Sequence, residues 1–486
     1  MSGNPDLSRR QLFFTAAALV GGVGLAACQG VGSGAKPQGI LQPGASTTVE
    51  GLLSRTPFYV AHRGSGDNWT EHSMESYAES VRLGVGALEV SVQATSDGVL
   101  VCHHDSTLKR LTGDPRKISQ LTHADLAGLS LDARLWLGPA SKPQMIPDLK
   151  DVLDRFAGTQ VIFIEDKQGT NTEALLDLMD GYPNSTEHFI WKQSFRGAHT
   201  TTVQSRGYKV WGYFDADQAT QFAAIVPMLD LVGLPVDADD DLFRRLVGYG
   251  KPVMAWEVHT RSQRDRLSEL GVQGMMCSNI PYVCRDKALH SADTFASGLR
   301  AAGDLPNNLE KGWGVQPIID ATAGSVTIKT PETSGYLLGS LCPIAETNYS
   351  LTVDLRWPVW LPKPQQYAAI AFGQLTDQSD AAATGYYLAL QADGQLGLFS
   401  GGPGMQGGTL LGSLQTEALQ EQGWVSLTIF VDPEKIRIVR DSNPEWTLQM
   451  KNAADRGGYI SLHKGYPEAL PVQFRGITVA KVDRAA

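Results

Sequence analysis

Apolar residues follow two different spacings along the chain, and the change falls near residue 304. From about residue 58 to residue 285, short continuous apolar runs alternate with amphipathic segments, a pattern typical of parallel strands covered by helices. The runs are FYVAHRG, ALEVSVQA, VIFIEDK, HFIWKQS, KVWGYFD, LVGLPVD, PVMAWEV and VQGMMCS. Eight such strands predict a closed α/β barrel, the TIM barrel.

A further apolar run, GVLVCHH, follows the second of these strands after the turn SDG, Ser96 to Gly98. A parallel crossover needs a dozen or more residues, so this turn is too short to lead into a barrel strand. We therefore expect this run to be a hairpin arm that bends back over the barrel.

Beyond residue 304 the apolar residues alternate with polar ones, and tight turns such as Asp-Gly separate the runs without helical spacers. This pattern predicts an antiparallel β-sandwich of the jelly-roll kind. The segment weakly resembles concanavalin-like and laminin-G-like jelly rolls, which implies possible contact with a glycan. Four aromatic residues are candidates to stack on sugar rings, with a core position as the alternative for each: Trp357, Trp360, Tyr386 and Trp424.

The N-terminus resembles a twin-arginine export signal that ends in a lipobox, because Arg9 and Arg10 precede an apolar run ending in LAAC. This run is shorter than the roughly 20 residues of a spanning helix, so we expect a processed signal, with an uncleaved membrane helix as the alternative. Cys28 would then carry a lipid and anchor the protein to the membrane of a bacterial cell envelope. The predicted segments are a signal (1–28), a flexible tether (29–54), a TIM barrel (55–292) and a β-sandwich (305–486).

Composition narrows the class of partner. With 42% apolar and 19% charged residues in 486, the chain is typical of a globular protein, and its net charge of −10 argues against nucleic acid as the main partner. Four cysteines remain after Cys28, and their spacing matches no zinc motif. Export would permit a disulfide between Cys277 and Cys284, while buried free thiols are the alternative for these two and for Cys102 and Cys342.

Titratable residues stand at the ends of several predicted strands. In a TIM barrel the carboxyl ends of the strands and the loops after them hold the active site. The first strand ends in His62 and Arg63, Glu89 lies in the second, and the third ends in Glu165 and Lys167. His103, His104 and Asp105 end the hairpin arm, and Ser278 and Asn279 follow the eighth strand.

The residue types at these positions point to phosphate chemistry. Glu89 shares one face of its strand with Ser91, and a buried carboxylate costs several kcal/mol unless a cation or strong donors offset it. Glu165 shares a face with Lys167, for which an internal ion pair is the alternative reading. Strand alternation lets only one of the two adjacent histidines point at the site. Carboxylates, cations and imidazoles together suggest a dication and basic side chains around a phosphate, with histidines for proton transfer.

Several segments resemble, in order, the signature of the glycerophosphodiester phosphodiesterase family over roughly residues 58–285. They are AHRG, EHSMESY, GALEVSVQATSDGVLVCHHDSTLKRLTG, IPDLKDVL, FIEDK, QSF, AWEV and GVQGMMCSNIP. The resemblance implies His62 and His104 as the acid and base, His104 being chosen over its neighbour because it precedes Asp105.

The same resemblance assigns the remaining roles. It implies that Arg63 helps to hold the phosphate, that Glu89 and Glu165 hold one divalent cation, and that Glu71 and Lys167 line the site. From its charge, Lys167 is also expected to bind the phosphate, and the cation is expected to be Mg²⁺ or Ca²⁺. Three residues are expected in supporting places: Glu71, Ser91 and Trp256.

Three positions depart from the family pattern. Ser91 stands where the family usually has a metal-binding aspartate, His72 and Ser73 replace an Asn-Thr pair, and Ser278 with Asn279 replaces a Thr-Asp pair. Ser91 removes a formal charge from the expected metal shell, so a dication would be held more weakly, or would be one such as Ca²⁺ that tolerates neutral oxygen ligands.

The leading hypothesis is an exported, metal-dependent phosphodiesterase that cleaves a glycerophosphodiester, or a substrate derived from a phospholipid, into an alcohol and glycerol phosphate. One alternative is a lyase similar to phospholipase D toxins, which would form a cyclic phosphate. Another alternative, motivated by Ser91, is a catalytically weak barrel that binds an envelope glycan or glycolipid.

Overall fold

The computed structural model describes residues 46–306, 315–329, 335–363, 366–378, 384–402, 408–452, 457–466 and 468–483. The predicted signal, Cys28 and most of the predicted tether lie outside these ranges. The described residues all fall in one compact unit of the chain. Among the helices in the described ranges, none has both the length and the hydropathy needed to span a bilayer.

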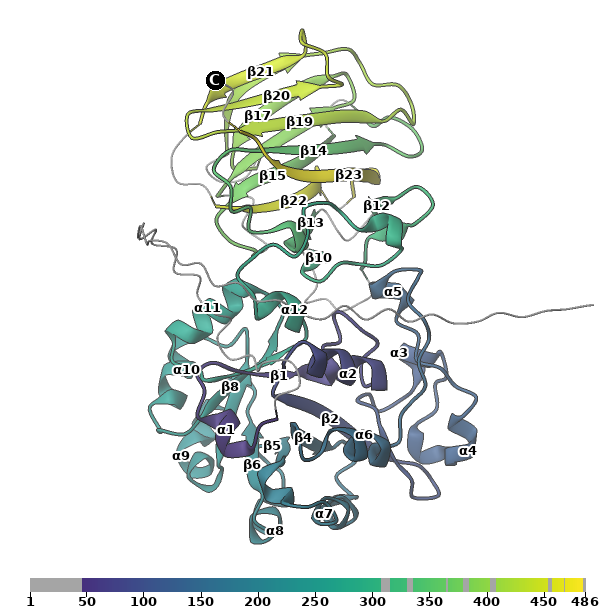
Figure 1. The fold of residues 1–486 in the computed structure, drawn as a ribbon, viewed down its shortest axis with the longest axis vertical. Helices are drawn as coiled ribbons and strands as arrows, with labels where there is room; N and C mark the ends of the chain where they lie inside the picture. Colours follow the sequence, from purple (N-terminus) through teal and green to yellow (C-terminus); the bar gives the residue numbers. More distant parts are fainter. Residues whose placement is uncertain are drawn as a thin grey trace, which may run out of the picture. The chain divides into compact units, whose positions relative to one another are not determined.

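The predicted barrel is confirmed. Its strands are β1 (Phe58–Ala61), β2 (Ala87–Ala94), β4 (Val161–Asp166), β5 (Phe189–Ser194), β6 (Lys209–Tyr213), β7 (Leu231–Pro235), β8 (Val253–Val258) and β9 (Gly274–Cys277). Neighbouring barrel strands pair in parallel, and β1 pairs with both β2 and β9, which closes the barrel (Figure 1). All eight strands coincide with the apolar runs of the sequence.

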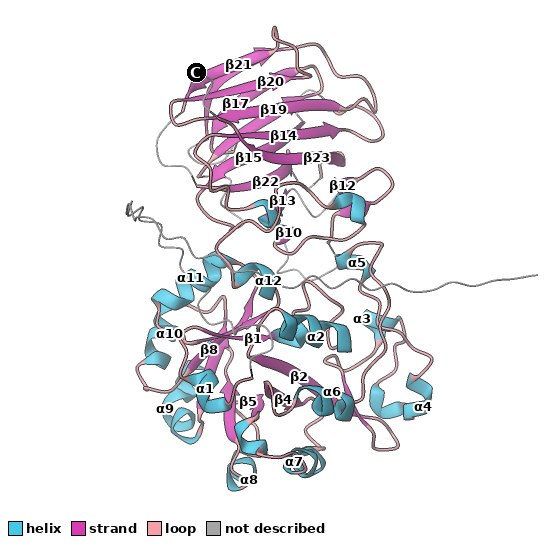
Figure 2. Ribbon diagram, in the orientation of Figure 1, coloured by secondary structure: helices cyan, strands magenta, loops and turns pink. Residues whose placement is uncertain are grey.

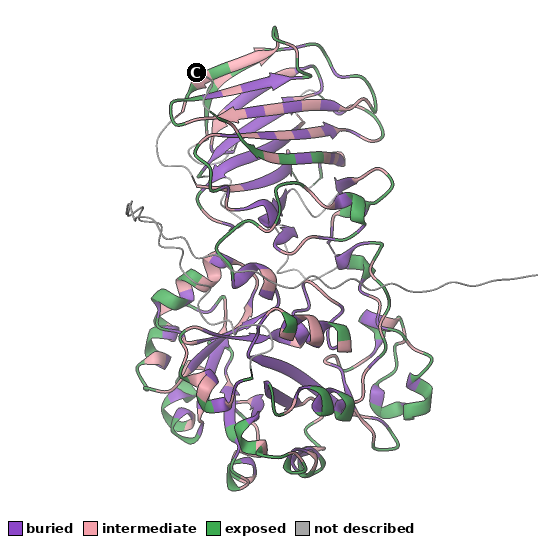
Figure 3. Cartoon of the chain, viewed as in Figure 1, coloured by how far each residue is buried: buried purple, intermediate pink, exposed green. Residues whose placement is uncertain are grey.

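Helices follow the strands and cover the barrel from outside (Figure 2). They include α2 (Met74–Arg82), α6 (Leu149–Phe156), α7 (Thr172–Asp180), α8 (Thr200–Ser205), α9 (Phe222–Ile225), α10 (Asp240–Val247), α11 (Arg261–Glu269) and α12 (Ile280–Val283). The helix α1 (Val49–Leu53) precedes β1 and packs instead against the apolar filling of the barrel. Side-chain caps fix where the helices begin: Ser73 accepts from the backbone of Ser76 at α2, and Thr260 accepts from that of Gln263 at α11. The strands are buried along their length, whereas the helices carry exposed residues on their outer faces (Figure 3).

The hairpin arm is also confirmed. Strand β3 (Leu100–Cys102) pairs antiparallel with β2, so that Cys102 lies opposite Val92. The segment after β3 forms the short helices α3 (Lys109–Thr112), α4 (His123–Leu126) and α5 (Arg134–Leu137) around an apolar cluster of its own. This arrangement brings residues 103–105 to the barrel strand β2, because His103 donates its backbone N–H to the carbonyl of Ser91 at 2.9 Å.

Apolar side chains fill the amino-terminal half of the barrel. They come from α1 and from the first inward positions of the strands. The inward members are Phe58, Val60, Ala87, Val161, Phe163, Ile190, Trp211, Leu231, Met254 and Met276. Because side chains alternate along a strand, the residue two positions further on also points inward, one layer nearer the carboxyl ends. Those next residues form the polar layer of the candidate site.

The second region is an antiparallel sandwich, as its alternating pattern predicts. One sheet has the order β10 (Asp304–Pro306), β13 (Gly335–Leu338), β22 (Tyr459–Lys464), β15 (Tyr367–Gln374), β16 (Tyr386–Gln391), β17 (Gln395–Ser400) and β18 (Thr409–Gln415). The other has the order β11 (Ile318–Asp320), β12 (Ser325–Ile328), β23 (Val472–Lys481), β14 (Tyr349–Arg356), β19 (Val425–Val431), β20 (Lys435–Arg440) and β21 (Thr447–Lys451). One apolar cluster lies between the sheets.

Two of the four aromatic residues suggested for sugar stacking belong to this core. Trp357 and Tyr386 are 2% and 1% exposed, so their rings are not accessible to a sugar. Trp424 lies beneath two guanidinium groups, those of Arg356 at 4.4 Å and Arg475 at 4.1 Å. Trp360 is exposed.

The four cysteines of the described region are free and buried, so the thiol alternative holds and Cys277 forms no bridge to Cys284. Buried thiols in apolar surroundings are poor nucleophiles, because burial, the largest cause, raises the pKa of Cys277 well above its usual value. These residues contribute to packing.

A buried polar network joins the barrel to the sandwich. Asp377, which follows β15, accepts hydrogen bonds from the backbone N–H groups of Arg261 at 2.8 Å and Ser262 at 3.0 Å, and from the hydroxyl of Tyr282 at 2.6 Å. The Arg261 guanidinium donates to the carbonyls of Cys342 at 2.6 Å, Lys287 at 2.8 Å and Tyr282 at 3.1 Å. It is also stacked on the ring of Tyr282, 4.0 Å from the centroid.

Candidate active site

A polar layer lies directly above the apolar filling of the barrel. On most barrel strands, the residue two positions after the last inward apolar residue also points inward, and most of these residues are polar. They are His62, Glu89, Glu165, Lys192, Tyr213, Trp256 and Ser278. Five of these seven positions were predicted from the sequence as part of the site or at its strand ends. Lys192 and Tyr213 were not.

His62 and Arg63 stand where β1 ends in a tight turn. His62 is 4% exposed, and its Nδ1 lies 2.9 Å from Oγ of Ser278 and 3.3 Å from Oε2 of Glu257. Arg63 adopts a φ of 51°, which turns its backbone N–H toward Oε2 of Glu89 at 2.9 Å. The next residue must be glycine, because a Cβ on Gly64 would lie 2.2 Å from Oγ of Ser76.

Glu89 and Glu165 are held together by Lys192. The Lys192 ammonium lies 2.8 Å from Oε1 of Glu89 and 2.8 Å from Oε2 of Glu165, and forms an ion pair with each. Oε1 of Glu165 also accepts hydrogen bonds from the Tyr213 hydroxyl at 2.7 Å and from Lys167 at 3.2 Å. Burial alone would raise the pKa of both carboxyls, but Lys192 outweighs it, holding that of Glu89 well below its usual range and, with Lys167, that of Glu165 at about 2. Both carboxylates are therefore ionised.

His104 lies at the same layer, carried by the hairpin arm. Its Nδ1 is 3.1 Å from Oδ1 of Asp105, and its Nε2 is 3.3 Å from Nζ of Lys167. Because an ammonium can only donate, Nε2 accepts and Nδ1 carries the proton that it donates to Asp105. Burial, with the neighbouring cations Arg63 and Lys167, lowers the pKa of His104 to about 4, so the ring is neutral at neutral pH. His103 points elsewhere and contacts the carbonyl of Thr107 at 3.2 Å.

Glu71 anchors two guanidinium groups. Arg110 of α3 lies 2.5 Å from Oε1 and 3.0 Å from Oε2 of Glu71, and 2.6 Å from Oδ2 of Asp105. Arg63 lies 3.3 Å from Oε1 of Glu71. Burial opposes the ionisation of Glu71, but Arg63 and Arg110 outweigh it and hold its pKa at about 2. Within the described residues the buried Nε of Arg63 has no acceptor, which leaves it free for an anionic oxygen.

Glu257 and His72 are site residues that sequence reasoning gave no role. Besides His62, the Glu257 carboxylate lies 3.8 Å from Arg63 and 3.7 Å from His259. His72, at the position of a usual asparagine, is buried, with Nδ1 2.7 Å from the hydroxyl of Tyr77. Its Nε2 has no partner in the part of the chain that the structure describes.

Trp256 closes the layer with two other aromatic rings. Its ring lies 5.8 Å from that of Trp211 and 5.3 Å from that of Tyr213, both in edge-to-face contact. The structure thus brings together all the predicted site residues of the barrel. Cys28 lies outside the described residues.

The donor set does not fit the expected divalent cation. No cluster of three or more histidine, cysteine, aspartate or glutamate side chains with a metal-binding arrangement occurs in the described ranges. Oxygens that would bind a cation already face donors: Oε1 of Glu89 accepts from Lys192 and from Oγ of Ser91 at 3.0 Å, and Oε2 accepts from the backbone of Arg63. Ser91 therefore uses its hydroxyl as a donor to Glu89.

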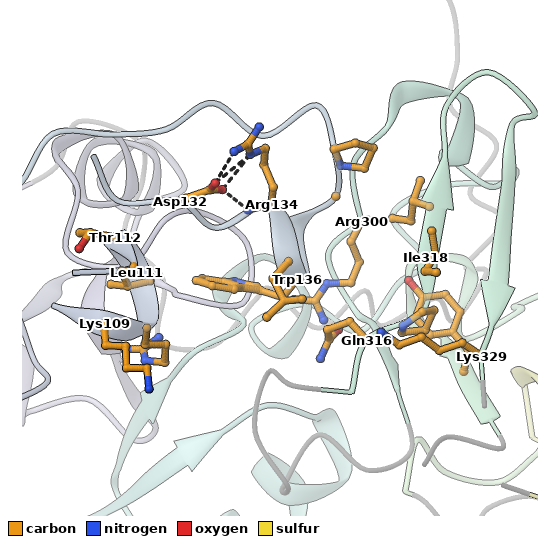
Figure 4. A pocket seen from close by; sticks show the side chains of 18 residues that line it. Lys109, Leu111, Thr112, Asp132, Arg134, Trp136, Arg300, Gln316, Ile318 and Lys329 are labelled. Atoms are coloured by element: carbon orange, nitrogen blue, oxygen red, sulfur yellow. Dashed lines mark hydrogen bonds and ion pairs between the residues drawn. The ribbon is translucent and has the colours of Figure 1, made fainter. Parts of the chain in front are cut away.

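A basic pocket of about 770 Å³ adjoins this layer. Arg110, which holds Glu71 and Asp105, also lines the pocket, and the indole N–H of Trp136 in its wall donates to the carbonyl of Gly66 at 2.9 Å. Figure 4 shows Arg134 turned toward Asp132, whereas Gln316 and Lys329 line another part of the wall. The charged residues of the lining are Lys109, Arg110, Asp132, Arg134, Arg300 and Lys329. Cations outnumber the one acid, so the pocket favours an anionic or neutral group.

Part of this chain is similar to known proteins. Residues 62–280 match the model of the Glycerophosphoryl diester phosphodiesterase family. The Glycerophosphodiester phosphodiesterase of Bacillus subtilis (strain 168) is 32% identical over 156 residues, which are 30% of this chain and about half (49%) of that relative. YhdW of the same organism, a candidate for the same activity, is 24% identical over 246 residues, 47% of this chain and 97% of YhdW. A solved glycerophosphodiester phosphodiesterase from Thermotoga maritima is 19% identical with a TM-score of 0.37, and the match covers 46% of this chain and 94% of that one.

Proposed function

We infer that this chain, whose residues 62–280 belong to the glycerophosphoryl diester phosphodiesterase family, hydrolyses glycerophosphodiesters to glycerol phosphate and an alcohol. One observation carries the inference: two histidines lie in the same polar layer, each with a carboxylate at Nδ1. Nδ1 of His104 faces Asp105 and its Nε2 accepts from Lys167, while Nδ1 of His62 faces Glu257. An imidazole oriented in this way can take or give a proton at its other ring nitrogen.

The proposed reaction is attack of water on phosphorus. Nε2 of His104 takes a proton from the water as the new P–O bond forms, and Asp105 stabilises the resulting imidazolium. His62 gives a proton to the alcohol oxygen as the old P–O bond breaks, and the Glu257 carboxylate orients the ring of His62. Arg63 and Lys167 face the negative charge that gathers on the phosphoryl oxygens in the transition state.

The activity is tested with the full-length protein and three substrates that differ in the charge of the alcohol: glycerophosphocholine, glycerophosphoglycerol, and a diglycerophosphate whose alcohol carries a second phosphate. We expect glycerol phosphate release from all three, with the cationic choline ester the poorest substrate because of the basic pocket. A folded protein that releases none would contradict the proposal and favour a role in binding an envelope glycan or glycolipid.

The pH dependence follows from the state of His104. A base must be neutral, so we expect kcat/KM to fall as pH drops through about 4, where His104 becomes protonated. Lys167→Met removes a neighbouring cation that lowers this pKa, so the acid limb should move to higher pH. Lys150→Met, on an exposed ion pair with Asp154, is the control that should leave the limb in place. An unchanged limb in Lys167→Met would contradict the assignment of His104 as the base.

We further propose that the protein is exported and anchored through a lipid on Cys28. The support is the sequence SRRQLFF followed by an apolar run that ends in LAAC. Labelling of growing cells with radioactive palmitate should mark the wild-type protein and leave Cys28→Ala unlabelled. Equal labelling of the two proteins would contradict the assignment.

A further inference from the structure

We propose that the ammonium of Lys192 occupies the place of a divalent cation, so that this site works without bound divalent metal. The inference rests on the proposed phosphodiesterase function and deepens it by naming the electrostatic element of the reaction. It also accounts for Ser91, because the sequence alone does not explain why the usual aspartate is lost at this position.

The position of Lys192 carries the inference. It is the inward residue of β5 directly above Ile190 of the apolar filling, and it is 7% exposed. Its Nζ lies 2.8 Å from Glu89 and 2.8 Å from Glu165, the two carboxylates predicted to share a cation. The rings of Trp211 and Tyr213 lie 5.7 Å and 5.8 Å from the ammonium and confine it between the two acids.

The carboxylates of the layer already have cationic partners. Four cations each lie within 4 Å of a carboxylate from a set of five. The cations are Arg63, Arg110, Lys167 and Lys192, and the carboxylates are Glu71, Glu89, Asp105, Glu165 and Glu257. A dication added between Glu89 and Glu165 would lie beside the ammonium of Lys192 and be repelled by it. An aspartate at position 91 would place a third acid on Lys192, whereas the serine hydroxyl donates to Glu89 instead.

An ammonium in place of a dication changes which groups activate the water and stabilise the transition state. A bound dication polarises the phosphoryl oxygens and also acidifies a water molecule, whereas an ammonium can only donate hydrogen bonds and supply charge. The two carboxylates occupy no more than two of the three N–H donors of Lys192, so one remains for a phosphoryl oxygen. Activation of water then depends wholly on His104.

Binding of Mn²⁺, followed by electron paramagnetic resonance, tests the inference without relying on turnover. We expect the chelator-treated wild-type protein to bind no Mn²⁺ at concentrations below about 1 mM, and its melting temperature to be unchanged by Mn²⁺. The double variant Lys192→Ala/Ser91→Asp should bind Mn²⁺ at least about tenfold more tightly than wild type and melt at a higher temperature with the metal. Ser91→Asp alone retains Lys192 and should gain no affinity, and Lys150→Ala is the surface control.

Turnover supplies the second readout. We expect wild-type activity to be the same with chelator and with Mg²⁺ or Ca²⁺, and Lys192→Met to lower it by about 10²-fold or more in chelator. Tight binding of Mn²⁺ by the wild-type protein, or loss of its activity in chelator, would overturn the inference and leave the phosphodiesterase standing. A folded protein with no turnover under any condition would instead overturn the proposed function. Even where the double variant does not fold, tight binding of Mn²⁺ in the wild-type titration would overturn the inference.

Discussion

Replacing His104 with asparagine is expected to lower turnover of a glycerophosphodiester by a factor of about 10² to 10⁴. Asparagine keeps a donor near Asp105 but has no group that can take a proton at neutral pH, so water would attack phosphorus without a base. The KM should change little, since the cations Arg63 and Lys167 that face the phosphate are untouched. Steady-state kinetics on the folded variant measure both quantities.

A matched control exists on the surface of the same domain. His123 also pairs with an aspartate, with its Nε2 2.7 Å from Oδ1 of Asp148, but the pair is exposed and stands outside the polar layer. His123→Asn should retain wild-type turnover. If His104→Asn retained it as well, the assignment of the base would be wrong.

Replacing Arg261 with methionine is expected to lower the free energy of unfolding by about 3–5 kcal/mol. Arg261 is 2% exposed, and its guanidinium donates to three carbonyls, those of Tyr282, Cys342 and Lys287. Methionine fills part of the volume but leaves those carbonyls without their charged donors in a buried place. Urea unfolding of the variant and the wild type measures the difference.

Arg206→Met is the comparison for that measurement. Arg206 also forms three ion pairs, with Glu173, Asp177 and Asp180, but all three carboxylates are exposed. Exposed ion pairs contribute little to stability, so this variant should lose much less of the free energy of unfolding than Arg261→Met. If the two variants lost the same free energy of unfolding, burial would not determine how much the Arg261 network contributes to stability.

The fold could be predicted from the sequence because continuous apolar runs are typical of buried parallel strands, and alternating runs are typical of antiparallel strands. The eight continuous runs form the barrel strands, and the short turn at residues 96–98 predicts that β3 pairs with β2 as a hairpin. The same alternation did not identify which sandwich aromatics are exposed. Trp357 and Tyr386 belong to the core because the face of a strand that turns inward depends on the partner sheet, which no local pattern specifies.

The site could be predicted only where its residues stand in recognisable strand ends. Lys192 was missed because its role depends on contact with Glu89, 103 residues earlier in the chain. Glu257 was missed because strand alternation turns Trp256 inward and its neighbour outward. The pairing of β8 with β9 shifts register between Trp256 and Val258, and this irregularity lets Glu257 reach His62. Arg110 comes from α3, in the segment after the hairpin arm, which carries no barrel pattern.

The expected metal site shows how Lys192, which was not predicted from the sequence, changes the chemistry. Two buried glutamates and a nearby serine, taken alone, are typical of a weakened cation site. With Lys192 between them the same glutamates form ion pairs with a fixed cation, and the serine completes their hydrogen bonding. A buried acid in a sequence therefore predicts a cationic partner, but which cation it is depends on the fold.

Attack of water on phosphorus without a metal can be measured by phosphorus NMR of glycerophosphoglycerol turnover in ¹⁸O-labelled water, with chelator present and the full-length protein. We expect glycerol phosphate as the product, with the isotope shift of one ¹⁸O bound to phosphorus, because water activated by His104 attacks phosphorus. Accumulation of a cyclic glycerol phosphate would instead indicate a lyase. Unlabelled glycerol phosphate, or an unchanged substrate with folded protein, would contradict the account.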